Sequence, residues 1–122
     1  MKVISKGDWA SEAGKTFTGP TRLERMLPAQ QEGGAALSLV RFRDGAVTNW
    51  HTHAGEQVLV IVEGQGRAGS ESETLSFSTG DVVYTPPGQR HWHGAQAGHD
   101  MAHLSFTTGG PPTWDGPPDV NQ

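Results

Sequence analysis

The sequence predicts one all-β domain, and three features of the chain lead to this expectation. Its 122 residues show no break in composition, so they fit a single core of ordinary size. Seventeen glycines and eight prolines are many for this length, and they divide the chain into short segments. No segment has the sustained periodicity of a long helix. Short strands joined by tight turns are therefore expected.

The first half of the chain contains two clear strand patterns. Residues 1–20 are expected to be irregular, apart from a short edge strand at 15–18. Residues 21–27 alternate apolar and polar side chains, which predicts a strand that ends before a proline. Residues 35–43 predict the next strand. If it is regular, one of its faces presents Ser38, Val40 and Phe42.

The second half begins with the strand that holds His51 and His53. Residues 57–63 are apolar on both faces, as expected for a strand between a barrel interior and a second layer, for instance another subunit. Residues 64–66, Gly-Gln-Gly, are expected to break this strand. Residues 67–70 and 74–77 are expected to form a hairpin of two strands. A further strand is expected at 82–85, where a Pro-Pro-Gly sequence ends it, and the last strand is expected at 101–107.

The C-terminal residues have a different composition from the rest. We divide the chain into a domain at 1–108 and a tail at 109–122, which contains four prolines and three glycines. An extended tail with little structure of its own is expected. Composition favours a flexible terminus, and Trp114 is the one residue there that could dock, for instance on a neighbouring subunit.

Charge and cysteine content narrow the function. The net charge is −4, the pI is about 5.8, and lysines and arginines do not cluster, so a nucleic acid or an anionic membrane has no obvious binding surface. Small-molecule substrates are expected instead. Without cysteine, a metal must bind to nitrogen and oxygen donors. The first residues lack the apolar stretch of a signal peptide, which favours the cytoplasm.

The spacing of His51, His53, Gln57 and a later His91 predicts a metal site. Residues two apart on a strand point to the same face, so the first three side chains can converge. A divalent transition ion needs three or four such ligands, and His91 at the end of a later strand supplies the fourth. Glu56 points the other way on a regular strand and becomes a rival ligand only if a bulge turns it inward.

Two linked motifs resemble those of the cupin family. The first is Gly45, five residues, His51-Thr52-His53, three residues, Gln57 and then Gly64, with Gln in place of the usual Glu. The second is Gly80, five residues, Pro86, one residue, Gly88, two residues and His91, with Ala95 where the family often has Asn. The resemblance implies a single-domain cupin, which is a double-stranded β-helix or jelly-roll barrel.

Within that family, WHTHAGEQVLVIVEG, GDVVYTPPGQRHWHGA and MAHLSF look closest to small bacterial manganese-dependent hydroxynitrile lyases. The resemblance implies one metal per subunit, manganese first and iron, nickel or zinc as alternatives, at His51, His53, Gln57 and His91. It places His93 and His103 in the pocket. A homodimer or homotetramer is expected. The relatives continue into a more polar, helix-like segment where this chain has its tail.

The residues themselves support Lewis-acid chemistry. Neutral Gln57 leaves the 2+ charge of an ion uncompensated, so the ion polarises a bound oxygen or nitrile more strongly. Uncoordinated His93 and His103 can transfer protons near neutral pH. The resemblance to hydroxynitrile lyases implies, for such a site, a carbon–carbon lyase that cleaves or forms aromatic cyanohydrins. An iron-dependent dioxygenase and a non-catalytic small-molecule sensor are the alternatives.

The pocket assignment has simpler alternatives. The expected pocket residues are Ser38, Val40, Phe42, Leu59, Ile61, Ser105 and Thr107, although a filled barrel core explains the apolar ones equally well. His93 could simply hydrogen-bond across the cavity mouth, and His99 in its loop is expected to be solvated. Trp50 and Trp92 are opposite in parity to the ligands, so they are expected to serve packing.

Overall fold

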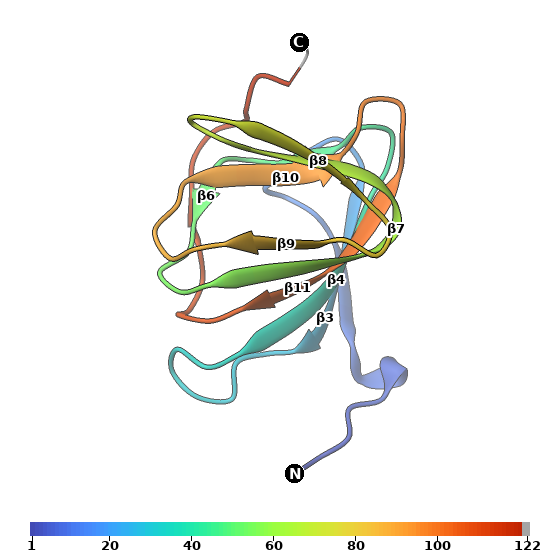
Figure 1. Cartoon of the computed structure of the whole chain (residues 1–122). Coiled ribbons are helices and arrows are strands. Elements are labelled where there is room, and N and C mark those ends of the chain that lie inside the picture. The colour runs from blue at the N-terminus through green and yellow to red at the C-terminus, as the bar shows by residue number, and fades with distance from the viewer. Residues whose placement is uncertain (121–122) are drawn as a thin grey trace.

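The structure is a computed structural model that describes residues 1–120, and it confirms the all-β prediction (Figure 1). Among these residues the one helical element is a 3-10 turn, η1 (Lys6–Asp8). The strands are β1 (Ala10–Ala13), β2 (Phe17–Thr18), β3 (Thr21–Leu27), β4 (Ala36–Phe42), β5 (Val47–Thr48), β6 (His51–Thr52), β7 (Gln57–Ser70), β8 (Thr74–Ser78), β9 (Val82–Thr85), β10 (His91–Ala95), β11 (Met101–Thr107) and β12 (Thr113–Trp114). No helix in this part of the chain is long and apolar enough to cross a membrane.

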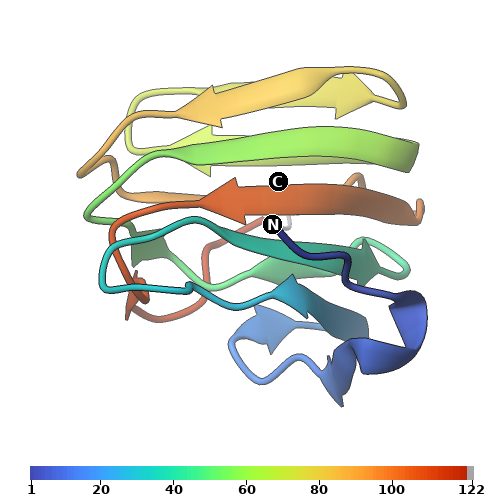
Figure 2. The same ribbon diagram turned by 90° about the horizontal axis from the view of Figure 1, so that it is seen from below.

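The strands form two facing layers that share β7. One layer has the order β1-β3-β4-β11-β7-β9, and the other has the order β8-β7-β10-β5-β2, with β6 beside β10 and β12 beside β6. All of these pairs are antiparallel. Figure 2 shows from below how the strands lie across the molecule. The expected jelly-roll barrel is confirmed.

The core fills the space between the layers. Its largest members are Phe42, Leu59, Ile61, Phe77 and Met101, all buried. Side chains alternate along β7 as the period of a strand requires, so neighbours of these residues point outward. One end of the barrel is polar rather than apolar inside. The functional site lies there.

The expected break at residues 64–66 is wrong, because β7 runs without interruption from Gln57 to Ser70. Gly64 has a φ of 80°, and a Cβ at this position would lie 2.1 Å from the backbone oxygen of Asp100. The pairing of β11 with β7 shifts register between Ala102 and His103, as a β-bulge does. The glycine therefore marks a bend that carries one strand from the first layer into the second.

Residues 1–20 contain more structure than expected. β1 pairs with β3, although the sequence predicts no strand there, and β2 lies within the expected edge strand at 15–18. All four residues of β1 are exposed. An edge strand without a buried face has no hydrophobic alternation, so its sequence gives no strand signal.

The remaining elements agree closely with the patterns. β3 and β11 have the expected bounds, β4 is one residue shorter at each end, and β7 with β8 forms the expected hairpin. Between Gly110 and Val120 the one regular element is β12, which pairs with β6. The last two residues of the predicted tail, 121 and 122, lie outside the described residues.

Candidate metal centre

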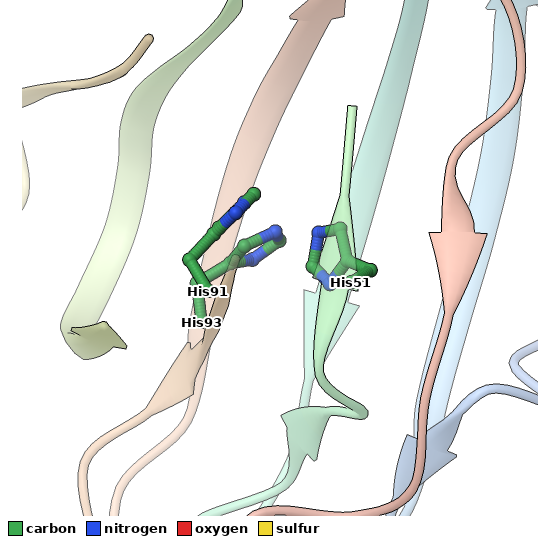
Figure 3. Close-up of side chains that lie close together, drawn as sticks. All are labelled: His51, His91 and His93. Atoms are coloured by element: carbon green, nitrogen blue, oxygen red, sulfur yellow. The ribbon is translucent and has the colours of Figure 1, made fainter. Parts of the chain in front are cut away.

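Five buried histidines gather at the polar end of the barrel: His51, His53, His91, His93 and His103. His51 on β6 lies directly opposite His91 on β10, because these strands pair in that register. Their ring centroids are 4.2 Å apart. Figure 3 shows the rings of His91 and His93 directed from one strand toward His51. One nitrogen from each of these three lies within 4.8 Å of the others, so they could hold a metal ion.

Backbone carbonyls fix the orientation of two of the rings. Nδ1 of His51 donates to the oxygen of Asn49 and Nδ1 of His91 to that of Gln89, both at 2.9 Å. In each neutral ring, Nε2 then has a free lone pair. A carbonyl bond of this kind orients metal-ligating histidines in general. The two rings are thus prepared to bind a cation through Nε2.

The side-chain amide of Gln57 completes this pattern. Its Nε2 donates to Oγ of Ser105 at 3.2 Å, which turns its Oε1 toward Nε2 of His91 at 2.9 Å. If the imidazole proton of His91 is on Nδ1 and is donated to Gln89, then Nε2 of His91 and Oε1 of Gln57 are both hydrogen-bond acceptors. Two buried acceptors in contact are unfavourable without a positive group. A divalent cation bound by both atoms would remove the conflict.

Several other buried nitrogens in the cluster have no hydrogen-bond partner. They are both ring nitrogens of His53, Nε2 of His93 and Nδ1 of His103. A buried polar atom without a partner is destabilising by roughly 1–3 kcal/mol, so such atoms point to a missing ligand. Nitrogen and amide oxygen donors suit manganese, iron, nickel and zinc. The residues present therefore fit a transition metal.

His93 and His103 form a pair. Nδ1 of His93 lies 3.1 Å from Nε2 of His103, and one of the two atoms must donate. If His93 donates, its Nε2 has a free lone pair and can bind a cation. If His103 donates, Nε2 of His93 carries the proton and can interact with a bound oxygen or nitrogen. The pair can thus serve either as a ligand or in proton transfer.

Burial keeps the cluster uncharged. Desolvation, assisted by the repulsive charge of His91, lowers the pKa of His51 to about 3 and that of His53 to about 4. Burial likewise lowers the pKa of His91, lowers that of His93 well below its ordinary value, and lowers that of His103 to about 4. All five rings are therefore neutral at pH 7. Neutral imidazole is the form that binds a metal.

The structure brings the four ligands expected from the sequence to this one end. It also brings His93, to which the sequence assigns proton transfer, into the group that could hold an ion. The two possible ligand sets share His51 and His91. They differ in whether His53 and Gln57 or His93 complete the site.

The rival residues lie elsewhere. The hydroxyl of Tyr84 donates to the carboxylate of exposed Glu56, so Glu56 is engaged outside the cluster. Trp50 lies under the guanidinium of Arg90, 4.1 Å from its ring centroid. Trp92 is buried and packs against Gly69. His99 is exposed in its loop.

A cavity of about 460 Å³ opens onto the histidines. Of the expected pocket residues, Ser38, Val40, Ser105 and Thr107 line it, together with His51, His53, Gln57, His93 and His103. Phe42, Leu59 and Ile61 are not in its wall but in the packed core behind it. These three side chains point into the barrel, as the cavity-lining side chains on the same strands do. The alternation of a strand therefore does not distinguish cavity wall from packed core.

Sequence reasoning missed several residues at this site. Thr48 lines the cavity, and its Oγ1 accepts a hydrogen bond of 3.1 Å from the backbone N–H of His93. The mouth is lined by Phe17, Leu23, Pro111, Pro112 and Trp114 from the terminal parts of the chain. A lone tryptophan in a Pro/Gly-rich tail was the one available signal for this wall.

Comparisons with known proteins agree with this picture. A model of the cupin domain matches residues 38–107. An (R)-mandelonitrile lyase from Granulicella tundricola is 37% identical over 109 residues, which cover 87% of this chain and 83% of that protein. A cupin-like protein of known structure from Thermotoga maritima has a TM-score of 0.79 at 28% identity, over 93% of this chain and 84% of that one. A predicted oxalate decarboxylase from the same organism has a TM-score of 0.73 at 18% identity, over 88% and 98%, which shows likeness of fold alone.

Proposed function

This chain belongs to the cupin family, and on that premise we propose that it is a metal-dependent lyase of the hydroxynitrile lyase type. It would cleave or form aromatic cyanohydrins. The observation that supports this most is the cluster of neutral, buried imidazoles with unpartnered nitrogens beside a cavity of small-molecule size. The name of the relative from Granulicella tundricola supports the reaction class.

His51, His53, Gln57 and His91 would hold the ion, with manganese as the first choice and iron, nickel or zinc as alternatives. When bound, a divalent ion supplies Lewis acidity toward the hydroxyl or the nitrile of a cyanohydrin. None of the four side chains is a carboxylate, so none of them neutralises its charge. Asn49, Gln89 and Ser105 orient three of the four side chains through the hydrogen bonds described above.

His93 would take the proton in this scheme. His93 is one of the residues that line the cavity, and its Nε2 has no hydrogen-bond partner, so this nitrogen would accept the hydroxyl proton of the cyanohydrin. The C–O bond then becomes the carbonyl, and the C–CN bond breaks with its electron pair on cyanide. The proton on His93 passes to cyanide, which leaves as HCN beside the aldehyde. His103 holds the His93 ring through the Nδ1 to Nε2 contact.

Metal analysis of protein purified without added metal tests this proposal. We expect manganese, loss of mandelonitrile cleavage on chelation, and recovery of cleavage when the metal is restored in the absence of oxygen. Iron with oxygen uptake would instead indicate a dioxygenase. Tight retention of a small molecule without turnover would indicate a sensor.

We further propose that the chain works in the cytoplasm as a homodimer or homotetramer on small molecules, with neither nucleic acid nor membrane as partner. The outer face of β7, β9 and β11 supports self-association, because it exposes Val60, Val62, Val82, Tyr84 and Phe106 on adjoining strands. An apolar face of this kind is often an interface. Light scattering measures the mass in solution, and the 13.0 kDa of a single chain would contradict the expectation.

A further inference from the structure

The wall of the cavity combines a part rich in histidines with a part that contains several apolar side chains. The inner end presents Gln57, Ser38, Ser105 and four histidines, of which all but His53 are on barrel strands. The mouth is formed by the terminal segments and by β3, and it also carries the charged side chains of Glu12, Lys15 and Arg25. Its apolar residues are Phe17, Leu23, Pro111, Pro112 and Trp114. A ligand that fits both ends has an oxygen-bearing head and an apolar body.

Trp114 stands at the junction of the two ends. Because β12 pairs with β6, Trp114 lies opposite His51, and the two ring centroids are 4.6 Å apart with planes inclined by 38°. The indole also approaches Phe17, at 6.4 Å between centroids. Trp114 lines the cavity and is 38% exposed, so its large flat ring is not fully covered by the protein. A planar apolar group entering the cavity would meet this surface.

The segment that holds Trp114 is fixed directly after β12, in spite of its prolines and glycines. The N–H of Asp115 donates to the oxygen of Trp50 at 2.8 Å, and the N–H of Trp50 donates to the oxygen of Gly116 at 3.0 Å. Nε of Arg90 contacts Oδ2 of Asp115 at 3.0 Å, while its guanidinium covers the ring of Trp50. A surface held in place before binding loses little entropy on binding.

We propose that Trp114 is a specificity-determining residue, which selects substrates with a planar aromatic substituent by stacking against it at the cavity mouth. This inference rests on the proposed function and assigns the preference for aromatic substrates to one residue. The head of the substrate lies at the histidines, and its ring lies against Trp114 beside Phe17. Aliphatic cyanohydrins of similar reactivity lack this contact, since a flexible chain stacks poorly on an indole.

The test compares cleavage of mandelonitrile with cleavage of the cyanohydrin of propanal. In Trp114→Ala we expect kcat/KM for mandelonitrile to fall about tenfold relative to that for the aliphatic substrate. Trp114→Phe should keep most of the preference, since it retains an aromatic ring. Asp115→Asn, which weakens the contact with Arg90, should shift the ratio in the same direction but only about twofold. Trp9→Ala is the matched control, because Trp9 does not line the cavity, and it should leave the ratio unchanged.

Metal content and direct binding separate the possible failures. Each variant is analysed for metal, and binding of benzaldehyde and propanal is followed by ligand-observed NMR. If the wild type cleaves neither cyanohydrin, the lyase proposal fails, while benzaldehyde binding that is lost in Trp114→Ala still supports the aromatic contact. The inference is overturned if the wild type binds both aldehydes equally, if Trp114→Ala impairs both substrates alike, or if that variant loses its metal, since Trp114 would then act through His51.

Discussion

The inner end and the mouth of the cavity are built in different ways. The inner end is made by paired strands of the barrel, where hydrogen bonds from ring nitrogens to carbonyl oxygens set the direction of the imidazoles. The mouth is made by terminal segments whose strands, β2 and β12, have two residues each. Rigid strands place reactive groups accurately, while segments outside the core can change without loss of the fold. The comparison suggests that chemistry and selectivity have separate structural origins.

The largest effect is expected when a histidine at the inner end is removed. We expect His53→Ala to lose the ion and all turnover, because an unpartnered buried ligand is deleted. Elemental analysis and mandelonitrile cleavage measure both effects. Correct folding of the variant is checked by circular dichroism.

His93→Ala is the matched variant, and it should keep the ion while its rate falls by a factor of about 10²–10⁴, as expected for loss of a general base. The reverse pattern, with metal lost in His93→Ala and retained in His53→Ala, would assign His93 to the ligand set with His51 and His91.

Acid should lower the free energy of unfolding of the metal-free protein, because it protonates the buried histidines at the inner end of the cavity. The pKa of His103 is about 4 in the fold and about 6.5 when unfolded, so the unfolded chain binds more protons between these values. Stability is complete above pH 6.5 and falls as the pH drops toward 4. From His103 alone we expect a loss of about 2 kcal/mol between pH 8 and pH 5. Urea denaturation at the two pH values measures it, and equal stability would contradict the buried neutral state.

A subtler change at the inner end replaces the amide by a carboxylate. Gln57→Glu should retain the metal, because a carboxylate is also a good oxygen ligand. Its negative charge reduces the effective charge of the ion, so kcat should fall on the order of tenfold. Metal content and kcat for mandelonitrile are measured together. An unchanged kcat would mean that the neutral amide has no electronic role.

The smallest effect is expected at the mouth. Asp115→Asn removes one partner of an ion pair whose side chains are 36% and 53% exposed. Such pairs contribute little, so we expect the free energy of unfolding to fall by about 0.5 kcal/mol with no change in metal content. Chemical denaturation and elemental analysis check this. A large loss of stability would show that the mouth is part of the cooperative core after all.

The same contrast explains what the sequence could predict. The spacing identifies His51, His53, Gln57 and His91 as a group, but not the way in which they converge. One regular strand is expected to carry the first three, whereas β6 ends at Thr52 and β7 begins at Gln57, so His53 lies in the loop between two strands. Whether His53 or His93 offers its nitrogen depends on ring rotation and tautomer, which spacing does not contain. Phe17 and Trp114 reach the cavity through long-range pairing with β5 and β6, which no local pattern encodes. The sequence predicts a break at Gly64, whereas the strand continues through it, because a glycine that bends a strand has the same local pattern as one that ends it.

The contact between Trp114 and His51 makes the indole a natural optical sensor of metal loading. Paramagnetic transition ions quench the emission of a nearby indole, and no other tryptophan of the described residues is in ring contact with a histidine of the cluster. Titrating manganese into metal-free protein should therefore dim the fluorescence in step with occupancy, and the Trp114→Phe variant should stay bright. The chain thus supplies its own label for following the ion.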